Sequence, residues 1–155
     1  MSRAHHRLDL LLVPVPWQRR PDPAALPALL AAVAEDPSCL VIEGQGSVRL
    51  DEPGGRVLYS NNMGGVRVRC PDCGAPLARP FAAAVERWKQ GEGEPEVACG
   101  CGSAHTIESL DCRPPVARGQ GALVLADAGA AELAPGARDC VSAVVGAFTL
   151  VYRRS

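Results

Sequence analysis

Four of the seven cysteines in this chain fall in two close pairs, a spacing typical of metal ligands. Cys70 and Cys73 are separated by two residues, which lets both thiolates face one ion. Cys99 and Cys101 stand one residue closer together. A glycine follows each pair at once and permits a tight turn in which backbone amides point at sulfur. The two pairs therefore predict a zinc site closed by four sulfur ligands.

The shorter spacing of the second pair leaves the fourth ligand open. His105 and Cys112 are the alternatives to Cys99, because imidazole nitrogen and thiolate sulfur both suit zinc. An interpretation of the pairs as buried free thiols explains less, since core packing alone does not produce two such pairs with glycines. Cys39 and Cys140 lie beside apolar residues, and we expect them in the core.

Residues 66–110 resemble the zinc-ribbon family, in which two Cys-x-x-Cys knuckles lie at the tips of β-hairpins. Cys70 and Cys73 match this pattern directly, and Cys101 matches it by the glycine that follows. Cys99 departs from the pattern, which expects a cysteine at position 98. The resemblance covers about a third of the chain and implies a Zn²⁺ cofactor with a structural role.

The ligand set favours a structural metal over a catalytic one. A catalytic zinc keeps an open position for water, whereas four thiolates close the coordination shell. A nucleobase deaminase would need a proline before the Cys-x-x-Cys pair and a His-x-Glu or Cys-x-Glu motif upstream. Arg69 precedes Cys70, and no such motif exists in the sequence. No Ser/His/Asp set stands in a recognised context either, so we assign no catalytic residues and consider an enzyme the less favoured interpretation.

The residues before and after the cysteine segment carry the patterns of strands and helices that predict a sheet. The apolar run at residues 8–16 predicts a buried strand. Leucines and a valine at helical spacing predict a helix that begins at Pro23 and ends before Pro37. The last third predicts a strand, a helix and a strand, at residues 122–126, 135–145 and 147–153. A strand-helix-strand unit therefore stands at each end, and the two units can share one sheet.

The middle of the chain carries shorter patterns. β-prone runs separated by turn residues predict strands with hairpin-like spacing at residues 40–43, 47–50 and 56–60. Alternation at residues 66–70 predicts a half-buried strand leading into the first cysteine pair. Phe81, Val85 and Trp88 lie at helical spacing and predict a short amphipathic helix at residues 80–90. We expect a returning strand at residues 105–110 and a loop at residues 113–121.

Together these patterns predict an α+β fold: a small mixed sheet with strand-helix-strand units at both ends and an inserted zinc-ribbon-like segment that carries a short helix. The 155 residues fit one domain, 1–155, with the insert at 66–112. A composition of 47% hydrophobic and 21% charged residues is typical of a globular protein.

Charge and hydropathy narrow the choice of partners. Sixteen basic and seventeen acidic residues give a formal net charge of -1, whereas a nucleic-acid binder usually carries a basic excess. Asp9 and Pro14 interrupt the apolar run near the N-terminus, which is too short to span a bilayer. We therefore expect no membrane partner, and we expect a cytoplasmic protein, because an odd number of cysteines in close pairs indicates reduced thiolates rather than a disulfide scaffold.

Two functions compete on this basis. The first is a non-catalytic, zinc-stabilised protein-binding module, for example an immunity or regulatory protein of a bacterium that caps a partner protein. The second is a zinc ribbon that binds nucleic acid or the transcription machinery. Residues 66–113 hold six basic and seven acidic side chains, and a phosphate-binding surface would need them sorted onto separate faces. Trp88 should pack the inserted helix against its surroundings; if exposed, it would be the candidate partner-binding residue.

Overall fold

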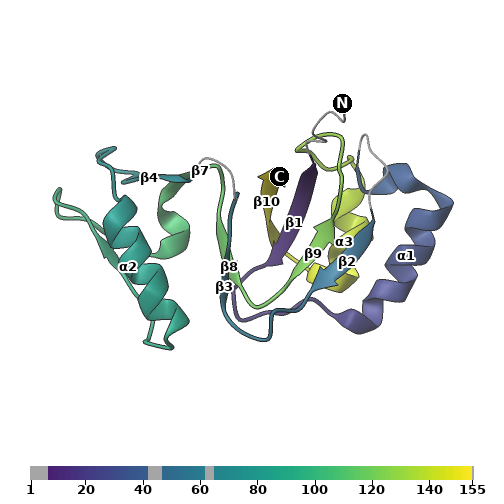
Figure 1. Ribbon diagram of the computed structural model, residues 1–155, viewed down its shortest axis with the longest axis horizontal. Helices are drawn as coiled ribbons and strands as arrows, with labels where there is room; N and C mark the ends of the chain where they lie inside the picture. The colour runs from purple at the N-terminus through teal and green to yellow at the C-terminus, as the bar shows by residue number, and fades with distance from the viewer. Residues whose placement is uncertain (1–6, 42–46, 62–64, 155) are drawn as a thin grey trace, which may run out of the picture.

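The chain forms two groups of elements joined by an antiparallel ribbon, as the computed structural model of residues 7–41, 47–61 and 65–154 shows (Figure 1). The three helices are α1 (Leu26–Glu35), α2 (Ala78–Lys89) and α3 (Ala137–Val145). The strands are β1 (Leu8–Pro14), β2 (Val48–Asp51), β3 (Val57–Tyr59), β4 (Arg67–Arg69), β5 (Val97–Ala98), β6 (Ala104–His105), β7 (Asp111–Arg113), β8 (Ala117–Gly119), β9 (Ala122–Leu125) and β10 (Phe148–Arg154). The α+β class is therefore confirmed.

The two strand-helix-strand units interleave in one sheet of order β10-β1-β9-β2. Each unit's two strands are separated by a strand of the other unit that runs the opposite way, as in a split β-α-β arrangement. Every strand pair in the described residues is antiparallel, so the expectation of a mixed sheet was wrong in this detail. No helix among residues 7–41, 47–61 and 65–154 has the length and apolar character needed to cross a bilayer.

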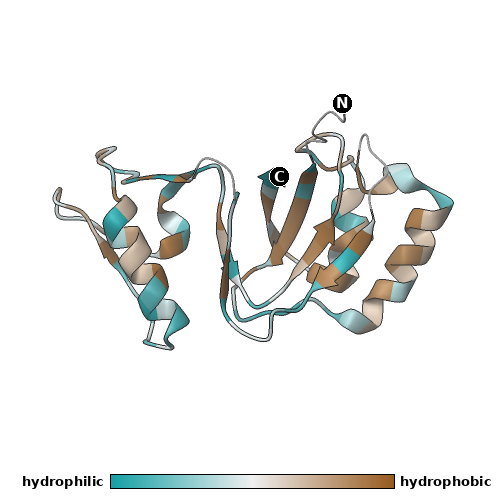
Figure 2. Ribbon diagram, in the orientation of Figure 1, coloured by the Kyte–Doolittle hydropathy of each residue, from teal (hydrophilic) through white to brown (hydrophobic). Residues whose placement is uncertain are grey.

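The inner strand β1 is buried on both faces, which explains why residues 10–13 are all apolar. Leu10 and Leu12 face a core formed with α1 and α3. Leu11 and Val13 face a second core, to which Tyr59 on β3 contributes. The apolar strands of the sheet and their covering helices stand out in Figure 2. We call this group of elements, with β1, β2, β9, β10, α1 and α3, the sheet lobe.

The segment between β2 and β9 leaves the sheet lobe as a ribbon of nested antiparallel pairs. β2 pairs with β9, β3 with β8 and β4 with β7. The prediction of hairpin-like pairing among strands at 40–43, 47–50 and 56–60 was therefore wrong, because the residues that pair with β2 and β3 lie 58 to 77 positions further along the chain. Of the run at 40–43, only residues 40 and 41 are described, and Val41 forms an isolated bridge with Leu133.

Two further expectations in this segment were wrong. The strand expected at 105–110 ends at His105, and a 3-10 turn, Ile107–Ser109, follows it before β7 begins. Ile107 and Leu110 are buried in the same core, whereas residues three apart in a strand point to opposite faces. The loop expected at 113–121 contains β8, whose three residues are all buried.

A third core forms at the far end of the ribbon, in what we call the cysteine lobe (residues 65–116). The predicted amphipathic helix is confirmed as α2, and it turns one face inward. The buried residues of that face are Phe81, Ala84, Val85 and Trp88. They pack against Val68 on β4, Val97 on β5 and Ile107.

A buried arginine stands where the ribbon meets both lobes. β8 alternates, so that Ala117 faces the core of the sheet lobe and Arg118 lies over the rings of Trp17 and Trp88. Its guanidinium group donates hydrogen bonds to the carboxylates of Glu94 and Glu108. The Arg118 side chain is only 4% exposed, whereas about half of each carboxylate side chain is exposed.

Replacing Arg118 by alanine is expected to lower the free energy of unfolding by about 2–4 kcal/mol, because a buried cation and its packing against two tryptophans are lost while the carboxylates regain water. Chemical denaturation measures the change. Arg49→Ala removes an exposed arginine from β2 and serves as the control, with an expected change within about 0.5 kcal/mol. Equal effects of the two substitutions would contradict a structural role for Arg118.

Candidate metal centre

The first cysteine pair lies in a turn that follows β4 directly. The Cys70 amide donates to the Ala75 carbonyl over 2.9 Å, and the Gly74 amide donates to the Cys70 carbonyl over 2.8 Å. Gly74 has a φ of +74°, a left-handed conformation that favours glycine. The alternation of β4, continued by Cys70, buries Val68 and Cys70 and exposes Arg67 and Arg69. The turn therefore directs Cys70 inward and leaves Cys73 exposed.

The second pair lies in a tighter turn between β5 and β6. The Cys99 amide donates to the Ser103 carbonyl over 2.9 Å, and the Gly102 amide donates to the Cys99 carbonyl over 3.0 Å. Gly102 also has a positive φ, +93°. This hydrogen-bonded turn is one residue shorter than that of the first pair, which accommodates the shorter cysteine spacing. β5 buries Val97 and exposes Ala98, so the alternation places Cys99, and not position 98, on the inner side.

The two turns bring four sulfur atoms together. The Sγ atoms of Cys70, Cys73, Cys99 and Cys101 all lie within 4.8 Å of one another. Cys70 and Cys101 are 3.9 Å apart, and Cys73 and Cys99 are 3.4 Å apart, measured between sulfurs. Tetrahedral zinc with Zn–S bonds of about 2.3 Å separates its sulfurs by about 3.8 Å. The donor set and its dimensions therefore fit one metal ion of this kind.

Two polar side chains border the sulfur cluster. Ser103 Oγ lies 3.0 Å from Cys101 Sγ and 3.6 Å from Cys70 Sγ. His105 Nε2 lies 2.9 Å from Ser103 Oγ, 3.4 Å from Cys70 Sγ and 3.6 Å from a carboxylate oxygen of Asp72. Groups in such positions orient metal ligands and stabilise thiolates by hydrogen bonding. Sequence reasoning missed Ser103, because a lone serine after a cysteine pair carries no distinctive pattern.

These neighbours shift the pKa values of the cysteine thiols in different directions. The hydrogen bond from Ser103 lowers the pKa of Cys70 to about 5 and also lowers the pKa of Cys101. The Cys101 backbone amide favours the Cys99 thiolate, but the Cys73 thiol and burial raise the pKa of Cys99 to about 12. Four thiolates this close repel one another, and a divalent cation removes that repulsion. The cluster thus has the chemistry of a site completed by a cation.

The two rival ligands occupy different positions. His105 forms a second potential metal group with Cys70 and Asp72, so that it shares Cys70 with the sulfur cluster. Cys112 lies on β7 in neither group, and burial raises its pKa to about 11. Cys39 and Cys140 are half-buried and pack against the core that the sheet forms with α1 and α3. The sulfur cluster therefore gathers the four cysteines of the two pairs.

Trp88 is not available as a partner-binding residue. Its side chain is 0% exposed and meets Trp17 edge to face, with ring centroids 5.2 Å apart. Arg56 donates to the Trp88 carbonyl over 2.5 Å and lies over the Trp17 ring. Trp88 therefore lacks the exposure on which its candidate role in partner binding depended, because α2 turns this side chain into the contact between the lobes. The expectation that Trp88 packs the inserted helix is confirmed.

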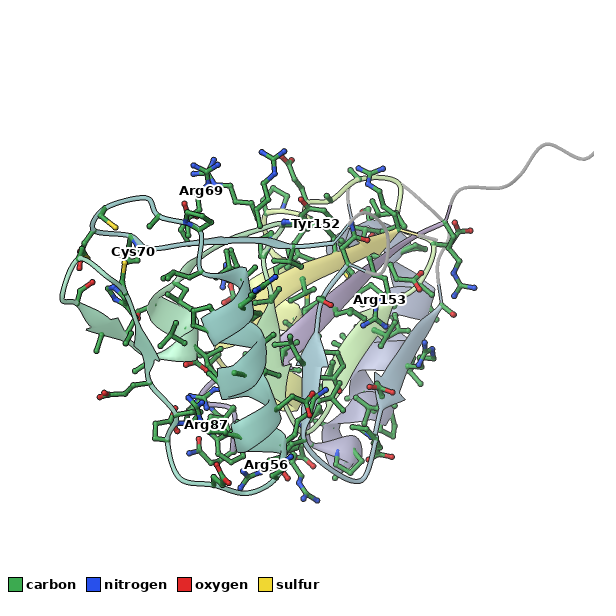
Figure 3. The ribbon with its side chains drawn as sticks, turned by 60° about the vertical axis from the view of Figure 1, so that its left-hand side comes forward. Arg56, Arg69, Cys70, Arg87, Tyr152 and Arg153 are labelled. Atoms are coloured by element: carbon green, nitrogen blue, oxygen red, sulfur yellow. The ribbon has the colours of Figure 1, made fainter. Side chains whose placement is uncertain are left out.

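The strand before the first cysteine pair also carries an exposed charged face. Arg67 and Arg69 point outward from β4, and Arg113 lies beside them on β7. Figure 3 shows the Arg69 side chain extending away from the ribbon close to Cys70. With Asp111 these arginines line a depression of about 270 Å³, and we call it the arginine face. The alternation of β4 could have indicated two of its members, but the register with β7 is not readable from the sequence.

No protein-family model matches the chain, and neither the curated proteins nor the solved structures contain a match to it. The resemblance to zinc ribbons thus rests on the two cysteine turns themselves.

The purified protein is expected to contain about one zinc ion per chain, measured by elemental analysis. Cys99→Ser should abolish this content, because it opens the sulfur shell. Cys112→Ser is the matched control and should leave the metal content unchanged. Zinc retained by Cys99→Ser but lost from Cys112→Ser would assign the fourth ligand to Cys112 instead.

Ser103→Ala should weaken zinc binding about 10–100-fold, because it removes a hydrogen bond to the cysteine sulfurs. Competition with a chromogenic chelator measures the affinity. Ser109→Ala, which removes a hydroxyl group hydrogen-bonded to Thr106, is the control and should not change the affinity. An unchanged affinity in Ser103→Ala would show that the serine does not support the ligands.

Proposed function

We propose that this protein is a non-catalytic protein-binding module whose cysteine lobe is held in shape by one zinc ion. Cys70, Cys73, Cys99 and Cys101 would hold the ion. The convergence of four sulfurs from two separate turns within 4.8 Å supports this proposal most directly. Without the ion, only the short two-stranded sheets β4–β7 and β5–β6 would hold the ends of these turns in place. Zinc binding would supply that constraint.

The ligand set supports a structural role. Four sulfur ligands complete a tetrahedral shell, so that no position is left for a water molecule or a substrate. Ser103 and His105 contact cysteine sulfurs and one another, and such hydrogen bonds stabilise thiolates. Two of the four cysteines are buried, and they belong to the core of the cysteine lobe. The ion would therefore connect the two turns and the lobe's core.

The shape of the chain supports a binding role. The cysteine lobe lies at the end of the ribbon, away from α1 and α3, and presents α2 and the two turns on its outside (Figure 1). Three cores fix these elements, so their exposed faces are presented in a defined geometry. A formal net charge of -1 is compatible with a protein partner.

A zinc ribbon that binds nucleic acid is the second candidate, and one observation favours it. Basic and acidic side chains of the cysteine lobe are partly sorted, because three arginines share the arginine face. Arginine binds phosphate groups through paired hydrogen bonds. Retention of the protein on nucleic acid that weakens as salt is added would support this candidate over the first.

Affinity purification from the source organism, before and after nuclease treatment, tests the proposal. We expect one protein to copurify in near-stoichiometric amount, to remain bound after nuclease treatment, and to bind the purified zinc-loaded chain directly. The Cys73→Ser/Cys101→Ser variant should lose this binding along with its zinc. Release by nuclease would favour the second candidate, and equal binding by the zinc-free variant would contradict a zinc-stabilised binding surface.

A further inference from the structure

The arginine face places two like charges opposite each other. Arg67 and Arg113 stand directly opposite each other across the β4–β7 pair. Directly opposed side chains in an antiparallel pair point to the same side and lie close together, so two like charges there repel. Arg69 stands opposite Asp111, and this carboxylate bonds to Arg113 Nε over 3.3 Å. The face therefore has three guanidinium groups and one carboxylate, which gives it a net charge of +2.

Little within the described residues offsets this charge. Arg67 and Arg69 form no ion pair there, and the Arg113 side chain is 81% exposed. The three arginines line one depression together with Asp111. Two strands fix their Cα positions, so a ligand meets the arginines already gathered. Like charges directly opposite each other disfavour the free chain, and an anion that enters the depression would offset this repulsion.

We propose that the arginine face binds carboxylate groups of an acidic segment on a partner protein. This inference rests on the proposed function, since it takes the partner to be a protein. Guanidinium groups bind carboxylates through two parallel hydrogen bonds, and an opposed pair of arginines offers two such forks to one segment. An acidic side chain entering between Arg67 and Arg113 would turn their repulsion into two attractive contacts.

The surroundings favour a short acidic segment over a nucleic acid. The face is local, because four side chains line its depression of about 270 Å³. Cys70 follows Arg69 directly, and four thiolates with one Zn²⁺ carry a net charge of -2. A phosphate backbone continuing beyond the depression would approach this negative charge and the exposed Asp72 carboxylate. A short segment places its carboxylates on the arginines alone.

Fluorescence anisotropy with the zinc-loaded full chain at low ionic strength tests the proposal. The probes are a labelled oligoglutamate peptide, an oligoglutamine peptide of the same length and a short DNA duplex. We expect the oligoglutamate to bind and the other two to bind more weakly. Arg67→Gln/Arg113→Gln should weaken oligoglutamate binding about tenfold or more, because two charge-assisted contacts are lost. Arg49→Gln makes a similar substitution at an exposed position of the sheet lobe and should leave binding unchanged.

Stability provides a second readout. The Arg67→Gln/Arg113→Gln variant should keep its zinc and melt at the same temperature as the original chain or higher, because a repulsion has been removed. Arg69→Gln, a single change, should weaken oligoglutamate binding without unfolding the lobe. The absence of oligoglutamate binding, binding that survives all these substitutions, or tighter binding of DNA that the same substitutions abolish would each overturn the proposal. None of these results touches the zinc content, whose absence from the original chain would refute the proposed function itself.

Discussion

The position of the cysteine lobe depends on the burial of one positive charge. Arg118 comes from the ribbon, its carboxylate partners come from the cysteine lobe, and Trp17 reaches it from the connection after β1. A guanidinium group removed from water is stable only where carboxylates and aromatic faces surround it in defined positions. Arg56 completes the contact from the other side, at the last turn of α2. Arg118, its two carboxylate partners, Trp17 and Arg56 therefore fix the cysteine lobe against the sheet lobe at one orientation.

The sulfur cluster concerns the inner structure of the cysteine lobe rather than its position against the sheet lobe. The cysteine lobe has two short strand pairs, β4–β7 and β5–β6, around one helix, and pairs of two or three residues contribute few hydrogen bonds. The cysteines act at the far tip of the lobe, where the ribbon no longer supports the chain. Because Cys70 and Cys99 also belong to the apolar core, an ion bound there would fix the turns and the core together.

The sequence predicts what is local and misses what depends on distant pairing. The period of 3.6 residues in Phe81, Val85 and Trp88 defines α2, and the apolar residues 10–13 of β1 indicate a strand covered on both faces. The cysteine spacing likewise predicts which sulfurs converge. The pairing of β3 with β8, and with it the burial of Arg118, joins residues far apart in the chain, and no short-range pattern encodes that register.

The same limit applies to the arginine face, and its energetics bear on function. The sequence of β4 shows two exposed arginines, but only the register with β7 places Arg113 opposite Arg67. A fold stabilised by three cores and by the Arg118 contact tolerates a local repulsion of this size, since one opposed pair costs a small part of the total stability. Local violations of pairing rules tend to occur where binding, rather than stability, determines the residues. Arginine thus plays two opposite parts in this fold. The buried Arg118 has carboxylate partners within the chain, whereas the arginines of the arginine face carry a surplus of positive charge that a carboxylate from a partner would neutralise.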